Sequence, residues 1–251
     1  MSTDWSMVCD DFYVSCRLFL KLDLALERET VLHFFDRVRK DFPGMQKFRR
    51  REDGCLILEE DPGPGVSRRW LRLEPNSLRF GHFAPLDVET VRKLAEVILE
   101  HAPYHLTFSE LDYDHLEVIY GFDLEYRGNH DQLVAETLWA DHPLGRFVLG
   151  EDTSHVIDSQ PYFGVALTPE CDLQAYVETK SRTSTYEVRT GEYERQSLSV
   201  FLTLRKYWIV AENRKPIDVA GDLFGRADEL AAGKIVPLLV SPLAQAIASQ
   251  L

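Results

Sequence analysis

Two long stretches of the chain alternate between apolar and polar positions with a period of two. In the first, from 12 to 26, apolar residues occupy every even position. In the second, from 116 to 126, Leu116, Val118 and Tyr120 begin the same alternation, with Glu117 between them. This pattern is typical of β-strands that bury one face against a core. The sequence therefore predicts two long, half-buried strands.

Each predicted strand is followed by a segment with helical periodicity. Val31, Phe34, Phe35 and Val38 recur at helical spacing until Pro43 and Gly44, which favour the end of a helix. After the second strand, Asn129 followed by Gln132 resembles a capping box, which predicts a short helix that stops near Pro143. A strand followed by a helix is thus predicted twice.

The remaining segments predict more strands and a closing helix in each half. Short apolar runs bounded by turn residues predict strands at 46–50, 55–58, 70–73 and 78–80, and then at 162–167, 173–177, 186–188 and 198–208. Asp87 is predicted to cap a helix that ends before Pro103, and Asp218 to open a final helical segment. The last stretch, 235–251, predicts a packed pair of helices.

The order of elements is the same in both halves, β-α-β-β-β-β-α. We therefore expect an α+β protein made of two tandem units, 1–103 and 104–251, that form a curved antiparallel sheet backed by helices. This topology is similar to the saddle of TATA-binding-protein-like folds.

Several motifs also resemble a sporadically distributed bacterial family of similar length, for which no activity is established. The resemblance lies in the two alternating strands, an Asp-rich final helix, and the motifs Asp41-Phe42-Pro43 and Arg68-Arg69-Trp70-Leu71-Arg72-Leu73. It implies the same layout of elements over most of the chain. It implies no particular chemistry.

The net charge of the chain limits the classes of partner that we expect it to bind. The chain carries 41 Asp and Glu against 28 Lys and Arg, a formal net charge of −13. A surface of this sign repels nucleic acids and anionic membranes, so we expect neither as a partner. The four cysteines are scattered and the first residues lack the pattern of a signal peptide, which predicts reduced thiols and a cytoplasmic protein.

One basic cluster interrupts this acidic chain. Arginines gather on two segments that the predicted hairpins place close together. They could hold a phosphate, a carboxylate or an acidic partner segment, or they could pair with nearby acidic residues. The predicted partner-binding residues are Arg49, Arg50, Arg51, Arg68, Arg69 and Arg72.

A second cluster contains residue types used in catalysis and in metal binding. Asp112, Asp114 and His115 follow one another closely, and His155 lies in a polar connection. They could meet in a pocket at the junction of the halves, or they could be solvated loop residues. Their spacing matches neither an EF-hand nor a zinc motif, so no metal or cofactor is predicted.

Two functions follow as expectations. The first is a non-catalytic binding or assembly module that engages a protein partner or a second copy of itself. The alternative is a small-ligand-binding protein or enzyme with a site at the junction of the halves. No residue pattern assigns a reaction, so the sequence leaves open whether the chain is an enzyme.

Overall fold

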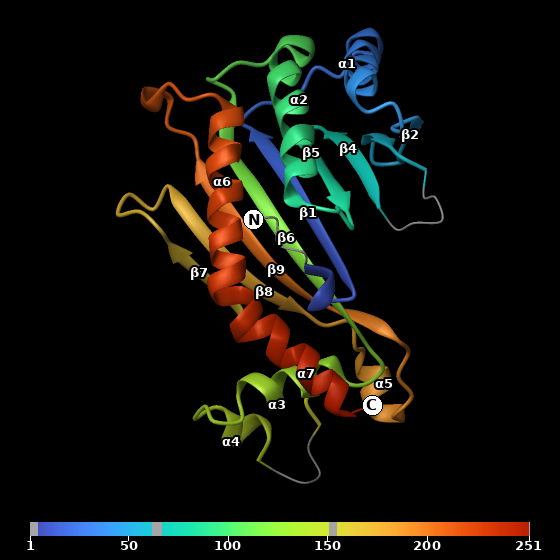
Figure 1. The fold of residues 1–251 in the computed structure, drawn as a ribbon, viewed down its shortest axis with the longest axis vertical. Coiled ribbons are helices and arrows are strands. Elements are labelled where there is room, and N and C mark those ends of the chain that lie inside the picture. Colours follow the sequence, from blue (N-terminus) through green and yellow to red (C-terminus); the bar gives the residue numbers. More distant parts are fainter. Residues whose placement is uncertain (1–4, 62–66, 151–154, 251) are drawn as a thin grey trace.

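A single antiparallel sheet of nine strands forms the centre of the molecule (Figure 1). The computed structural model describes residues 5–61, 67–150 and 155–250. The strand order is β2-β3-β4-β5-β1-β6-β9-β8-β7. The strands are β1 (Asp11–Leu20), β2 (Lys47–Arg50), β3 (Leu56–Glu59), β4 (Arg68–Glu74), β5 (Ser77–Phe83), β6 (Tyr113–Tyr126), β7 (Tyr162–Ala166), β8 (Leu173–Lys180) and β9 (Gln196–Tyr207). The predicted α+β class with an antiparallel sheet is confirmed.

The two long strands predicted from alternation lie side by side at the middle of the sheet. β1 pairs with β6 from Asp11 opposite Asp123 to Leu20 opposite Tyr113. The first strand is shorter than the pattern predicts, because the register shifts between Phe19 and Leu20 and the chain then leaves the sheet. Leu24 and Leu26 still pack against the core from the connection that leads into the next helix.

One face of the sheet carries a layer of long helices (Figure 1). They are α1 (Arg28–Asp41), α2 (Val88–Leu106), α6 (Pro216–Leu230), the π-helical segment η3 (Ala231–Val240) and α7 (Ser241–Gln250). Even-numbered residues of β1 and β6, such as Val14 and Tyr120, are fully buried beneath these helices. We call this side of the sheet the helix-side face and the other side the open face.

The remaining elements are short. They are η1 (Trp5–Met7), α3 (His130–Leu138), α4 (Gly145–Val148), α5 (Thr185–Thr190) and η2 (Val210–Glu212). The predicted strand at 186–188 is wrong, because this segment is α5. Ser184 caps α5 with a complete capping box to Glu187, and Gly191 ends it at φ 72°. The second half therefore has three strands after β6, one fewer than predicted.

Two other local predictions are corrected. Helix α2 does not stop before Pro103 but continues to Leu106, and its C-cap, Thr107, adopts a left-handed φ of 55°. Pro103 lies inside this helix, where it removes one i→i−4 hydrogen bond without ending the helix. Asn129 caps α3 as predicted, but the Gln132 side chain accepts a hydrogen bond from the Val156 backbone instead of closing a capping box.

The C-terminal segment is one long helical run instead of a pair of helices. Residues Pro216–Gln250 form the one candidate membrane-spanning helix found in the described residues, and 28% of its most apolar window is buried in the molecule. Ile235, Val240, Leu243 and Ile247 from this run belong to the core. The run is therefore part of the helical layer of the domain.

The two halves share one sheet and one core. The boundary expected after residue 103 lies inside α2. A single cluster of buried apolar residues contains Leu18 and Leu71 from the first half and Leu202 and Phe224 from the second. The halves therefore do not form separate cores.

Candidate functional site

The sheet ends on one side in β7, a strand that carries no charged residue and is exposed along its length. All five of its residues are exposed, and the exposed fractions of Tyr162, Phe163 and Val165 are 60%, 58% and 56%. Tyr162 lies on the open face, whereas Phe163 and Val165 lie on the helix-side face, because strand residues alternate. An exposed apolar edge strand is a template for pairing with another chain.

The backbone of β7 has free hydrogen-bonding groups along its outer side. The Pro161 carbonyl accepts from the Thr179 amide at 3.0 Å, and the Leu167 amide donates to the Leu173 carbonyl at 2.8 Å. In an antiparallel ladder these bonds use alternate residues, so the odd positions of β7 face β8. The amides and carbonyls of Tyr162, Gly164 and Ala166 therefore point away from the sheet.

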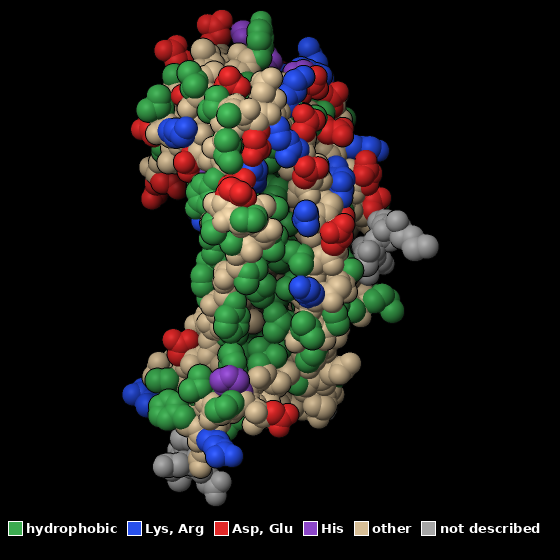
Figure 2. Space-filling view, turned by 90° about the vertical axis from the view of Figure 1, so that its left-hand side faces the viewer, with side chains coloured by type: hydrophobic (Ala, Val, Ile, Leu, Met, Phe, Trp, Pro, Cys, Tyr) green, Lys and Arg blue, Asp and Glu red, His purple; other side chains and the backbone are tan. Residues whose placement is uncertain are grey.

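On the helix-side face, Ala175 and Thr179 of β8 are buried, whereas β7 is exposed and the centroid of its Phe163 ring lies 6.5 Å from that of Trp139 at the end of α3. In the first half, α1 extends over the corresponding end of the sheet, and its Phe35 reaches Phe48 of β2 with ring centroids 5.6 Å apart. In the second half, α3 lies beside α7 at the end of the sheet instead (Figure 1). Seen from the β7 side, hydrophobic side chains gather along the middle of the molecule and charged ones at its upper end (Figure 2).

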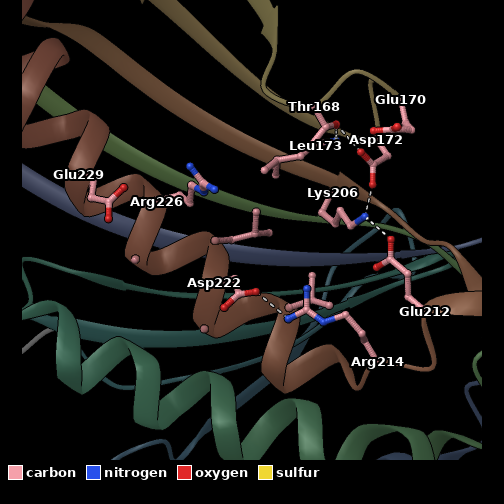
Figure 3. Close-up of a pocket in the computed structure, with 14 residues that line it drawn as sticks. Thr168, Glu170, Asp172, Leu173, Lys206, Glu212, Arg214, Asp222, Arg226 and Glu229 are labelled. Carbon is pink, nitrogen blue, oxygen red and sulfur yellow. Dashed lines mark hydrogen bonds and ion pairs between the residues drawn. The ribbon is translucent and has the colours of Figure 1, made fainter.

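A groove of about 760 Å³ lies between α6 and the end of β8 (Figure 3). Gly221 and Gly225 of α6 line it, and no atom lies within 4 Å of where their Cβ atoms would be. Lys206 of β9 lies in the groove between two carboxylates, donating to Asp172 and, at 2.9 Å, to Glu212. Arg214 similarly pairs with Asp222 at 2.7 Å.

These pairs keep Lys206 in its protonated form. Burial alone would lower the pKa of Lys206, but its hydrogen bonds to Asp172 and Glu212 outweigh burial and raise that pKa above its ordinary value. A lysine that stays protonated is neither a nucleophile nor a base. Lys206 is therefore held as the ion-pair partner of Asp172 and Glu212.

Tyrosines support β7 from the open face. The Tyr176 ring lies over Gly164, where a Cβ atom would approach its Cε1 to 2.7 Å. Tyr162 stacks on Tyr176 with centroids 5.7 Å apart. Gly164 is thus required by a close approach of an aromatic ring, which fills the space of the missing side chain.

The predicted arginine cluster is divided between the two faces of the sheet. Register places Arg49, Arg68 and Arg72 on the open face, and Arg50 and Arg69 on the helix-side face. Arg51 lies just beyond β2. Arg49 pairs with Glu59 at 2.9 Å and Arg69 with Glu60 at 2.7 Å, as the alternative interpretation expected. Arg72 lies in a row with Arg79 of β5 and Arg17 of β1.

The residues of the predicted junction pocket lie at opposite ends of β6. Asp114 contacts the His115 ring at 2.7 Å, and Asp112 accepts hydrogen bonds from Ser109. His155 is exposed and adjoins Val156, which is bonded to Asn129 beyond the other end of the strand. β6 has 14 residues, so its two ends lie roughly 44 Å apart. The structure does not bring them together.

His115 instead belongs to a buried pair on the open face. Its Nε2 lies 3.7 Å from Glu117, which accepts from Arg205 Nε at 2.7 Å. Burial raises the pKa of Glu117, whereas the neighbouring His115 and Arg205 lower it, and the net result is a pKa below the ordinary value. Glu117 thus remains an ionised partner of Arg205. Among the described residues, no group of three His, Cys, Asp or Glu side chains is placed to hold a metal ion.

Comparison with protein-family models and with curated proteins finds no match. The site must therefore be interpreted from its own geometry. The sequence predicted a strand at 162–167 but gave no sign that it would be the last strand of the sheet.

Proposed function

We propose that this chain is a non-catalytic assembly module in which two copies join through their β7 strands. A second β7, running antiparallel, would extend the sheet across a two-fold axis. The observation that carries this proposal is the exposed, uncharged strand with unpaired backbone groups at Tyr162, Gly164 and Ala166. A general protein partner that added a strand there would use the same groups.

The order of residues along β7 favours a second copy over an unrelated segment. A two-fold axis at Gly164 would place Tyr162 opposite Ala166 of the other copy, a large residue against a small one. It would place Phe163 opposite Val165 on the helix-side face, an aromatic against a β-branched residue, which is a favourable cross-strand pair. Each contact would occur twice, as a two-fold interface requires.

Electrostatics does not oppose this pairing. The net charge of −13 would repel two copies that met at most other surfaces, but β7 contributes no charge to the contact. At moderate salt, charges farther than roughly 10 Å from the interface are largely screened. Residues Lys47 and Arg50 on β2, at the other edge, would instead repel their counterparts.

We further propose that the two halves are versions of one β-α-β-β-β-α unit. The strand order supports this, since reading outward from the centre gives β1, β5, β4, β3 on one side and β6, β9, β8, β7 on the other. β2 is then an addition to the first half. In this scheme β7 corresponds to β3, which is covered by β2 on its outer edge.

Sedimentation analysis of the intact chain tests the assembly proposal. We expect a dimer for the natural sequence and a monomer for Val165→Lys, because a lysine at the interface would be opposed by charge and desolvation. Leu86→Lys is the matched control, since Leu86 is 88% exposed away from the edge, and this variant should remain dimeric. A natural sequence that is monomeric at both low and high salt would refute the proposal.

A further inference from the structure

Three arginines of the first half lie side by side on the open face. Arg72 of β4 lies opposite Arg79 of β5, and Arg79 lies opposite Arg17 of β1. Directly opposed residues on neighbouring strands have Cβ atoms about 5 Å apart, where like charges repel. A row of three cations is therefore unfavourable unless anions balance it.

The protein balances only one of the three charges directly. Arg17 contacts the Glu74 carboxylate and also donates to Ser77 Oγ at 3.1 Å. Arg72 and Arg79 form no ion pair or hydrogen bond with any residue within 5–61, 67–150 or 155–250. Glu117, the next residue in the row after Arg17, is already bonded to Arg205. Two positive charges thus remain without a paired anion.

Both of these guanidinium groups are held in place by an aromatic ring. Arg72 Cζ lies 4.7 Å and Arg79 Cζ lies 5.5 Å from the centroid of the Trp70 ring. Trp70 is buried, and its ring lies against Gly81, where a Cβ atom would be 2.8 Å from Cζ2. Stacking of this kind fixes the planes of the arginines but leaves their hydrogen-bond donors free.

Unsatisfied polar atoms gather at the same place. The Nε atoms of Arg72 and Arg79 are buried without a hydrogen-bond partner, and so is Ser15 Oγ in the adjoining row. Buried polar groups are nearly always satisfied, so such a group calls for a ligand or another explanation. Burial and the charges of Arg17 and Arg72 lower the pKa of Arg79 more than Glu74 and Glu117 raise it, and a bound anion would raise it further.

We propose that Arg72 and Arg79 bind a phosphate group on the open face, with Arg17 as a third contributor. Two unpaired guanidinium groups match the two negative charges of a phosphate, whereas a carboxylate would leave one unmatched. The phosphate could be inorganic or carried as a monoester by a larger molecule. The site is distinct from the β7 edge and does not depend on the proposed dimer.

Thermal unfolding and calorimetric titration with inorganic phosphate test this site, with chloride adjusted to constant ionic strength. We expect a rise in Tm of roughly 4 to 7 °C at about twenty times the dissociation constant, because phosphate binds only the folded state. Acetate should give at most a small shift. Arg72→Met combined with Arg79→Met should weaken phosphate binding at least tenfold, and Arg39→Met on exposed α1 should leave it unchanged.

A second variant protects the test against misfolding. Arg79→Lys keeps the charge but loses the planar fork, so it should fold and bind phosphate several-fold more weakly. A simple phosphate monoester that binds more tightly than inorganic phosphate would identify a carried group, and equal binding would identify the free ion. Equal shifts with phosphate, acetate and chloride, or equal shifts in the natural and Arg72→Met/Arg79→Met proteins, would overturn the proposal.

Discussion

The two ends of the sheet differ in cover and in the chemistry of their last strand. At the β2 end, α1 and α2 lie over the sheet, and three of the four residues of the edge strand are basic. At the β7 end, α6 lies over β6 and β9, all five residues of β7 are exposed, and the edge strand has no charge. Charged residues on an edge strand hinder pairing with other chains. The β2 end, which we call the closed end, is therefore protected against pairing with another chain. The β7 end, which we call the open end, is exposed to such pairing.

Replacing a phenylalanine by alanine should lower the free energy of unfolding much more at the β2 end of the sheet than at the β7 end. Phe34 of α1 is fully buried, so Phe34→Ala should lower the free energy of unfolding by about 3 to 5 kcal/mol. Phe163→Ala should change it by no more than about 0.5 kcal/mol, because Phe163 is 58% exposed. Urea unfolding of dilute protein measures both. A large loss of stability for Phe163→Ala would mean that β7 is already covered.

Low pH should reduce the stability of the protein, because unfolding lets the buried His82 of β5 take up a proton. This buried imidazole contacts Ser67 Oγ at 2.8 Å, and burial lowers its pKa from 6.5 to about 4. The unfolded state therefore binds the proton at higher pH than the folded state, so stability falls as the pH drops from about 6.5 to about 4. The full loss is about 3 kcal/mol.

The His82 contribution can be isolated by comparing slopes. Stability measured against pH should fall less steeply for His82→Gln than for the natural sequence within this window. His33→Gln, at an exposed position of α1, should keep the natural slope. Identical slopes for all three proteins would show that His82 is not buried in its neutral form.

Side-chain hydrogen bonds should contribute more stability at the start of α3, in the second half, than at the start of α2, in the first half. Asp131 at the start of α3 is buried and accepts from the Ser159 amide at 2.8 Å and from Ser181 Oγ at 2.7 Å. Asp131→Ala leaves both donors without their partner and should cost about 2 to 3 kcal/mol. Asp87→Ala, which removes the cap of α2, should cost about 1 kcal/mol. Thermal melting distinguishes them, and a reversed order would contradict this account.

Removing the charges of β2 should create a second open edge with little change in stability. Lys47 and Arg50 are exposed, so Lys47→Thr combined with Arg50→Val should alter unfolding by about 0.5 kcal/mol or less. A chain with two pairing edges should form elongated oligomers in sedimentation experiments, because repeated pairing does not close. Arg50→Glu keeps the edge charged and should behave as the natural chain does. Unchanged sedimentation of the double variant would refute the protective role of β2.

The sequence by itself determined the elements that depend on local pattern. The alternation at 12–26 and 116–126 placed β1 and β6, and the turn residues placed the strands that follow them. It failed at 186–188, where a capping box and Gly191 stabilise a helix over three apolar-rich residues that resemble a strand. It also failed at 21–26, where the alternation continues but the pairing partner does not.

Only the tertiary structure decided which strands end the sheet and which arginines meet. Strand order depends on contacts between residues far apart in sequence, so nothing local distinguishes β7 from an interior strand. Arg17, Arg72 and Arg79 come from three strands and face one another through register alone. A shift of one residue in either pairing would turn one of them to the other face, because side chains alternate along each strand.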